Sequence, residues 1–151
     1  MSSPNPIVTK VELIRFEITV PNTTTDRAGM GVSYLPGPGT PMDRLAIRMH
    51  TDVGIVGEYV LPRARAKVTM AACEALSHAL LNKPALERER HYQTMRRATK
   101  HVGEVGIGPL DVALWDIAGK HQGVSIGTML GGYRYRLPTY ASTLGGDTRP
   151  D

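Results

Sequence analysis

The spacing of apolar residues changes once along this chain, near residue 63, and that change limits the folds open to it. Before it, a third short strand is expected at 55–60, and in two earlier stretches, 7–20 and 44–51, apolar side chains recur at every second position, a spacing typical of half-buried strands. After it they recur every three or four positions, which predicts helices. A block of strands followed by a block of helices indicates an α+β fold.

The connections between these segments indicate their arrangement. A long loop, 21–43, follows the first strand, whereas a short turn at 51–54 joins the second to the third. This order predicts a three-stranded antiparallel meander followed by a helical bundle. We expect the helices at 63–82, about 85–101, 109–123 and 125–130, and one last strand at 137–142.

The net charge of +4 does not indicate nucleic-acid binding. The basic residues are scattered, and those near residue 90 are interleaved with Glu87 and Glu89, as on a solvated helix face. A chain with one Phe and one Trp also lacks the stacking aromatics of most nucleic-acid modules. We therefore expect no nucleic-acid partner.

The single cysteine, Cys73, excludes an internal disulfide and suits a reducing compartment. The first ten residues, MSSPNPIVTK, lack the pattern of a signal peptide, and no apolar run approaches a membrane span. We expect a soluble, cytoplasmic protein with no membrane partner.

The stretch GPLDVALWDIAGKHQG, residues 108–123, holds two carboxylates that could be catalytic. On a helix, Asp111 and Asp116 point about 140° apart, so they cannot share a proton or a metal ion. Asp116 instead precedes Lys120 by four residues, the favourable order for a surface ion pair. Asp111, in the first turn, suits the positive end of the helix dipole. We interpret both as structural.

Other candidate motifs fail on their context. GVSIG at 123–127 matches a nucleophile elbow, but a helix precedes Ser125 and no histidine follows it, so Ser125 is better interpreted as an N-cap. The glycines of GEVGIG, 103–108, have the wrong spacing for a dinucleotide fingerprint. No histidine pair has metal-ligand spacing, and Cys73 is interpreted as a small core residue rather than a reactive thiol. The sequence predicts no catalytic residue and no metal ligand in this chain.

The loop 21–43 leaves two interpretations open. It places Thr23, Thr24, Thr25, Asp26, Arg27 and Tyr34 among glycines and prolines. A loop of this length is either disordered or a lid that closes over a ligand.

The amino-acid sequences of two segments resemble those of proteins in the mandelate racemase and muconate-lactonising branch of the enolase superfamily. Those segments are GPLDVALWDIAGKHQG and MLGGYRYRLPTYAS, 129–142. The front half is also similar, with D-x-G at 52–54 and G-E at 57–58. The resemblance implies an α+β capping domain at 1–132 and the start of a (β/α) barrel at 133–151, with the remainder absent.

The resemblance implies that catalysis takes place in the barrel domain. There a proton alpha to a carboxylate is removed, and Mg²⁺ stabilises the resulting enediolate. It implies Mg²⁺ in the complete enzyme, with none bound by this chain, and a small-molecule carboxylate such as a hydroxy or sugar acid as substrate. The capping domain carries specificity. By position, the resemblance assigns Arg27 and Tyr34 of segment 21–41, and Tyr59 of segment 58–62, to substrate contact.

Two functions follow as expectations. The first is the specificity-determining capping domain of a dehydratase, racemase or cycloisomerase, inactive alone. Because such a domain exposes surface that the barrel would cover, we expect self-association, as in a homo-oligomer. The alternative is a freestanding, non-catalytic interaction module.

Overall fold

The computed structural model describes residues 5–25, 32–61 and 66–140. It divides into two compact units. The first comprises Met1–Phe16 and Arg44–Tyr133, and the second comprises Glu17–Asp43 and Arg134–Asp151. The first unit holds the helices and the larger part of the three-stranded sheet, an α+β arrangement that confirms the predicted fold class.

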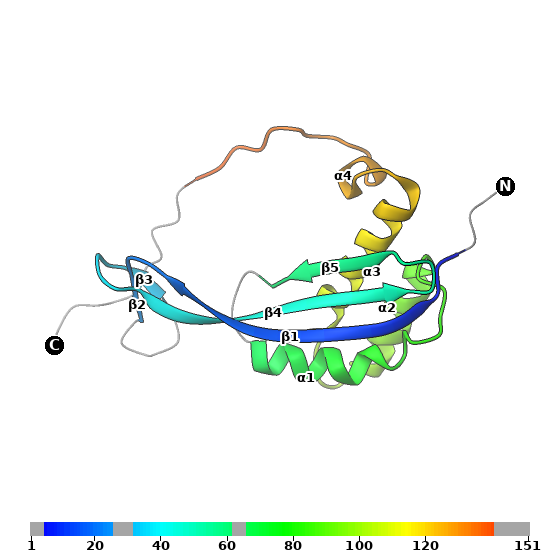
Figure 1. The fold of residues 1–151 in the computed structure, drawn as a ribbon, viewed down its shortest axis with the longest axis horizontal. Helices are drawn as coiled ribbons and strands as arrows, with labels where there is room; N and C mark the ends of the chain where they lie inside the picture. Colours follow the sequence, from blue (N-terminus) through cyan, green and yellow to red (C-terminus); the bar gives the residue numbers. More distant parts are fainter. Residues whose placement is uncertain (1–4, 26–31, 62–65, 141–151) are drawn as a thin grey trace. The chain divides into compact units, whose positions relative to one another are not determined.

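The sheet has the strand order β1-β4-β5, formed by Val8–Val20, Thr40–Thr51 and Val56–Val60 (Figure 1). Strands β4 and β5 are antiparallel, with Arg48 opposite Glu58 and Met49 opposite Gly57. The predicted meander is confirmed, because the strands that neighbour each other follow the predicted order. The turn between β4 and β5 contains Gly54 at a φ of 80°, a conformation that favours glycine.

Four helices follow: α1, Ala66–Ser77; α2, Arg88–Ala98; α3, Ile107–Gln122; and α4, Ile126–Met129. Helix α3 ends where predicted, because Gly123 adopts a φ of 67° and its N–H bonds back to the last turn. The Ser125 hydroxyl accepts a hydrogen bond from the N–H of Thr128, which confirms the predicted N-cap. Helix α1 ends earlier than expected, at Ser77, and turns replace its last predicted residues.

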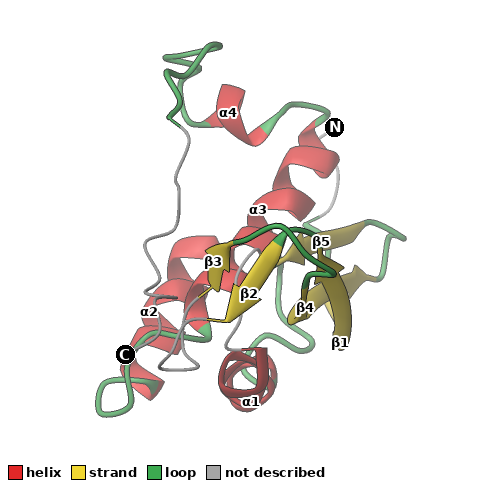
Figure 2. Ribbon diagram, turned by 90° about the vertical axis from the view of Figure 1, so that its left-hand side faces the viewer, coloured by secondary structure: helices red, strands yellow, loops and turns green. Residues whose placement is uncertain are grey.

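The core lies between one face of the sheet and helices α1 to α3, which lie on the same side of it (Figure 2). Its largest fully buried side chains include Leu45, Ile47, Met49, Leu110 and Leu114. Cys73 is fully buried, and its S–H lies 3.5 Å from the carbonyl oxygen of Gly106. Burial raises the pKa of this thiol to about 11. These observations support its interpretation as a core residue.

The second unit shows two short strands within the segment 21–43, which the sequence indicated only as a long loop. Strands β2, Thr23–Thr25, and β3, Val32–Tyr34, form an antiparallel hairpin in which Thr23 lies opposite Tyr34. The buried hydroxyl of Thr23 donates to the carbonyl of Val20 at 2.7 Å and accepts from the N–H of Thr40 at 3.1 Å. One side chain thus ties the ends of the segment together. Each strand has three residues, too few for a period of two to be recognised.

The strand expected at 137–142 does not form over its described part. Residues 137–140 adopt no regular structure, and Leu137 and Tyr140 are 69% and 89% exposed. Residues 141–142 lie outside the described ranges. A strand requires hydrogen bonds to a neighbour, and the described residues offer no strand partner to 137–140.

Candidate functional site

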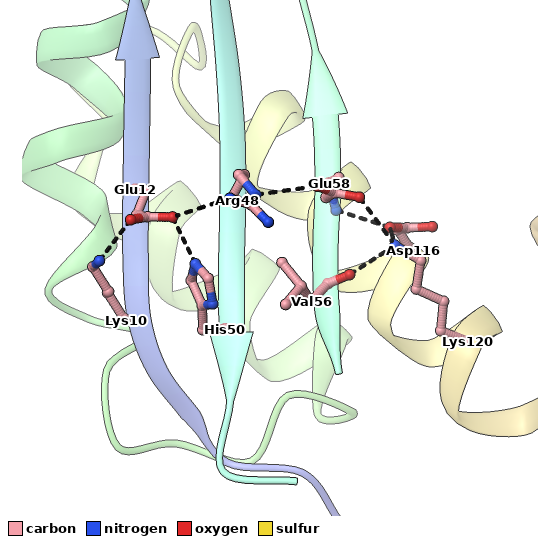
Figure 3. Close-up of polar contacts among 8 residues, drawn as sticks. All are labelled: Lys10, Glu12, Arg48, His50, Val56, Glu58, Asp116 and Lys120. Atoms are coloured by element: carbon pink, nitrogen blue, oxygen red, sulfur yellow. Dashed lines mark hydrogen bonds and ion pairs between the residues drawn. The ribbon is translucent and has the colours of Figure 1, made fainter. Parts of the chain in front are cut away.

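A row of charged side chains crosses the face of the sheet that points away from the helices (Figure 3). It begins with Lys10 and Glu12 on β1, where the Glu12 carboxylate bonds the Lys10 ammonium and the His50 ring, the latter at 2.7 Å. The Arg48 guanidinium lies 3.9 Å from Glu12 and donates to Glu58 at 3.1 Å. Opposite charges alternate along the row, so each is stabilised by its neighbours.

Glu12 has the most perturbed carboxylate of this row. The hydrogen bonds from Lys10 and then His50 lower the pKa of Glu12 from 4.5 to about 2. Glu12 therefore remains ionised throughout the physiological range. Through its contacts with Lys10 and His50, Glu12 links strands β1 and β4.

The row ends on helix α3, where Asp116 and Lys120 bind the free edge of β5. The Asp116 carboxylate accepts a hydrogen bond from the backbone N–H of Glu58 at 2.8 Å. The Lys120 ammonium donates to the carbonyl of Val56 at 2.7 Å and lies 2.7 Å from Asp116. The Asp116 carboxylate and the Lys120 ammonium thus pair backbone groups of β5 that a further neighbouring strand would otherwise pair.

This geometry confirms the predicted Asp116–Lys120 pair and gives it a second role. Burial would lower the pKa of Lys120, but the bonds to Asp116 and the nearby Glu58 carboxylate outweigh burial and raise it. The ammonium therefore stays charged, as its contact with the Val56 carbonyl requires. The sequence showed the helical spacing of the pair but not the strand beside it.

Asp111 lies in a separate environment, against α2. The Arg88 guanidinium stacks over the Trp115 ring, 3.5 Å from the ring centroid. Burial raises the pKa of Asp111, although the Arg88 charge and a hydrogen bond with Trp115 oppose that shift. The predicted separation of the two aspartates is confirmed, since they contact different elements. In the described ranges no group of three or more His, Cys, Asp or Glu side chains is placed to hold a metal ion.

The predicted contact residues fall in both units. Tyr59 lies on β5 opposite Ile47 in the first unit and is half-buried. Tyr34 lies on β3 in the second unit and is 60% exposed. Arg27 lies outside the described residues. Their role in substrate binding stays a prediction.

The second unit also contains an open hollow of about 340 Å³ that the sequence did not indicate. Its lining comprises Thr23, Thr24, Thr25, Leu35, Pro36, Gly37, Pro38, Gly39, Thr40 and Pro41. Gly39 makes the fold of this wall possible, because its φ is 99° and a Cβ there would lie 2.5 Å from the Val20 carbonyl oxygen. The Thr23 hydroxyl is already engaged with Val20 and Thr40, whereas the hydroxyl groups of Thr24 and Thr25 are chemically able to donate and accept hydrogen bonds. The run of three threonines was the signal available in the sequence.

A comparison with known families identifies this arrangement. Residues 42–131 match the family described as mandelate racemase / muconate lactonizing enzyme, N-terminal domain. The chain belongs to this family. The matched residues include β5, α3 and the Asp116–Lys120 pair, so the edge contact lies within the part that defines this N-terminal domain.

Two curated relatives have names that refer to sugar acids or their lactones. D-galactonate dehydratase from Ralstonia pickettii is 37% identical over 129 residues, which are 81% of this chain and 33% of that protein. D-galactarolactone cycloisomerase from Agrobacterium fabrum is 32% identical over 104 residues, 64% of this chain and 27% of that protein. The chain thus spans about a third or less of the length of these relatives.

Solved structures agree with the family assignment. A member of the enolase superfamily from Polaromonas sp. JS666 has a TM-score of 0.72 at 25% identity, covering 90% of this chain and 36% of that one. L-talarate dehydratase from the same organism, complexed with Mg and L-glucarate, shares the fold with a TM-score of 0.66 at 23% identity, over 85% of this chain and 36% of that one.

None of the described helices is long and apolar enough to cross a membrane.

Proposed function

We propose that this chain is the substrate-capping, specificity-determining N-terminal domain of a Mg²⁺-dependent sugar-acid dehydratase, with D-galactonate as the first substrate to test. The identity with D-galactonate dehydratase supports the substrate class. The observation that carries the capping role is the hairpin of the second unit, whose open, threonine-lined hollow lies in the segment predicted to close over a ligand.

The proposal divides the work between two domains. Residues 1–132 form the capping domain and 133–151 begin the barrel. Mg²⁺, when bound in the complete enzyme, stabilises the enediolate formed when the proton alpha to the carboxylate is removed. The described residues of this chain include no ligand cluster for it. Their part is to present Tyr59 on β5 of the first unit and Tyr34 on the hairpin of the second unit.

A chimeric enzyme tests this division. Residues 1–132 are joined to the barrel of the Ralstonia pickettii D-galactonate dehydratase, and kcat/KM is measured for D-galactonate and for L-glucarate. We expect dehydration of D-galactonate, and we expect Tyr34→Ala and Tyr59→Ala each to change the ratio of the two kcat/KM values about tenfold, the effect of roughly 1.4 kcal/mol of differential binding.

The control variant is Val102→Ala, because Val102 is 79% exposed and lies in neither proposed contact segment. The specificity role is wrong if the ratio stays unchanged in both tyrosine variants while the chimera is active. A second assay uses the 151-residue chain alone with Mg²⁺ and D-galactonate, where we expect no dehydration. Turnover there would overturn the placement of catalysis outside this chain.

A further inference from the structure

The backbone of β5 is held at both of its edges next to Tyr59. On the outer edge, the N–H of Glu58 donates to the Asp116 carboxylate at 2.8 Å (Figure 3). The carbonyl of Val56 accepts from the Lys120 ammonium at 2.7 Å. Backbone groups of successive residues alternate between the two edges of a strand, so those of Tyr59 face the neighbouring strand β4. Side chains of α3 and the pairing with β4 therefore fix the strand on which Tyr59 lies.

Gly57 determines where along α3 this strand can lie. A Cβ at Gly57 would lie 2.2 Å from the carbonyl oxygen of Ala113. A shift of β5 by two residues would again present an N–H to Asp116, but it would bring Ile55 or Tyr59 to this point. Neither side chain fits there, so only the observed register satisfies both contacts. Tyr59 is half-buried on the same face as Gly57, so the position of its ring depends on how β5 lies against α3.

We propose that Asp116 and Lys120 are positioning residues for Tyr59, and that they affect substrate selectivity through β5 rather than by touching the substrate. This inference rests on the proposed function, in which Tyr59 contacts the substrate. A carboxylate only accepts and an ammonium only donates, so each side chain can hold only one kind of backbone group. Without either of them, β5 can move relative to α3. A displacement of about 1 Å in a substrate-positioning group is enough to change kcat/KM.

The first test follows the Tyr59 ring directly and does not depend on activity. The 151-residue chain is labelled with 3-fluorotyrosine, and the fluorine NMR signal of Tyr59 is assigned by its loss in Tyr59→Phe. We expect Asp116→Ala to shift or broaden this signal. Asp116→Asn should change it less, because an amide oxygen can still accept from the N–H of Glu58. An unchanged Tyr59 signal in Asp116→Ala overturns the proposal.

The matched control for the NMR experiment is Arg88→Ala. Arg88 lies on α2 and stacks over Trp115, so this variant removes a contact of α3 with another helix and leaves the contacts with β5 in place. We expect the Tyr59 signal to keep its position. A shift as large as that in Asp116→Ala would show that the ring responds to any loosening of α3, which also overturns the proposal.

The second test measures selectivity in the chimera of residues 1–132 with the D-galactonate dehydratase barrel. We expect Asp116→Ala to change the ratio of the kcat/KM values for D-galactonate and L-glucarate roughly three- to tenfold, and Lys120→Ala to change it in the same direction. In a Tyr59→Ala background, Asp116→Ala should have no further effect, because the ring that it positions is gone. A loss of folded protein alone would lower both kcat/KM values equally and leave their ratio unchanged.

The outcomes separate this inference from the proposed function. If Tyr59→Ala changes the ratio and Asp116→Ala does not, or if the two effects add, the positioning role is wrong while the capping role stands. If Tyr59→Ala leaves the ratio unchanged, Tyr59 is not a substrate contact, and the inference fails together with that part of the proposed function.

Discussion

At Gly57, helix α3 packs directly against strand β5. A Cβ at Gly57 would lie 2.2 Å from the carbonyl oxygen of Ala113 and 2.6 Å from Cγ1 of Ile117. We expect Gly57→Ala to lower the free energy of unfolding by about 1–3 kcal/mol or more, because the helix must move away from β5. Urea denaturation followed by circular dichroism measures this change.

The matched control for Gly57 is Gly108→Ala. A Cβ at Gly108, in the first turn of α3, meets nothing within 4 Å, so alanine should leave stability unchanged or raise it by up to about 1 kcal/mol. Equal destabilisation by both variants would show that the close approach of α3 to β5 does not set the choice of glycine at position 57.

Glu12 gives the fold a specific dependence on pH. Its folded pKa of about 2 lies below the ordinary value of 4.5, so the folded state binds the proton less readily than the unfolded state does. Its contribution to stability is therefore present above pH 4.5 and is lost as the pH falls toward 2. We expect Glu12→Gln to be less stable than the parent at pH 7, with the difference disappearing near pH 2.

Urea midpoints of the two proteins, measured at intervals from pH 7 to pH 2, test this prediction. An NMR titration of the Glu12 carboxyl carbon gives its pKa directly. A midpoint near 4.5 in that titration would contradict the contacts with Lys10 and His50 as the cause of the shift.

At the scale of elements, Asp116 and Lys120 couple helix α3 to strand β5. Because they bind each other and adjacent backbone groups of one strand, their effects should not be additive. We expect Asp116→Ala and Lys120→Ala each to cost about 1–2 kcal/mol, and the double variant to cost less than the sum. A double-mutant cycle by urea denaturation measures the coupling, and simple additivity would contradict it.

The control for that cycle is the surface pair of Glu87 and Arg90. It has a similar distance, 2.9 Å, but the Arg90 side chain is 78% exposed. Since exposed pairs contribute little, Arg90→Ala should change stability by less than about 0.5 kcal/mol. A larger loss there would mean that ion pairing alone, without the strand edge, accounts for the effect at Asp116 and Lys120.

At the scale of the whole molecule, the described residues provide no cluster of metal ligands. A metal ion that binds the folded state stabilises it in proportion to the logarithm of its concentration over Kd. We therefore expect the melting temperature of this chain to be the same, within about 1 °C, in about 10 mM MgCl₂ and in EDTA. A rise of several degrees with Mg²⁺, but not with matched NaCl, would show a metal site in this chain.

The sequence by itself determined the elements whose side chains repeat with a regular period. The strands around Ile47, the helix around Trp115 and the N-cap Ser125 follow from local spacing and capping chemistry. It also separated Asp111 from Asp116, because helical geometry alone sets that angle. The resemblance carried by the segment 108–123 then indicated the family.

Only the tertiary structure decided what those residues contact. The hairpin at Thr23 and Tyr34 is held by pairing across the second unit, and strands this short carry no readable period. Asp116 meets Glu58 across fifty-eight positions of chain, and Gly57 meets Ala113 across a similar span. The strand expected at 137–142 is a second example. Its described residues, 137–140, have a strand-like sequence but pair with no strand among the described residues. Periodicity is a local property of the chain, whereas strand pairing and close packing depend on which distant segments fold together.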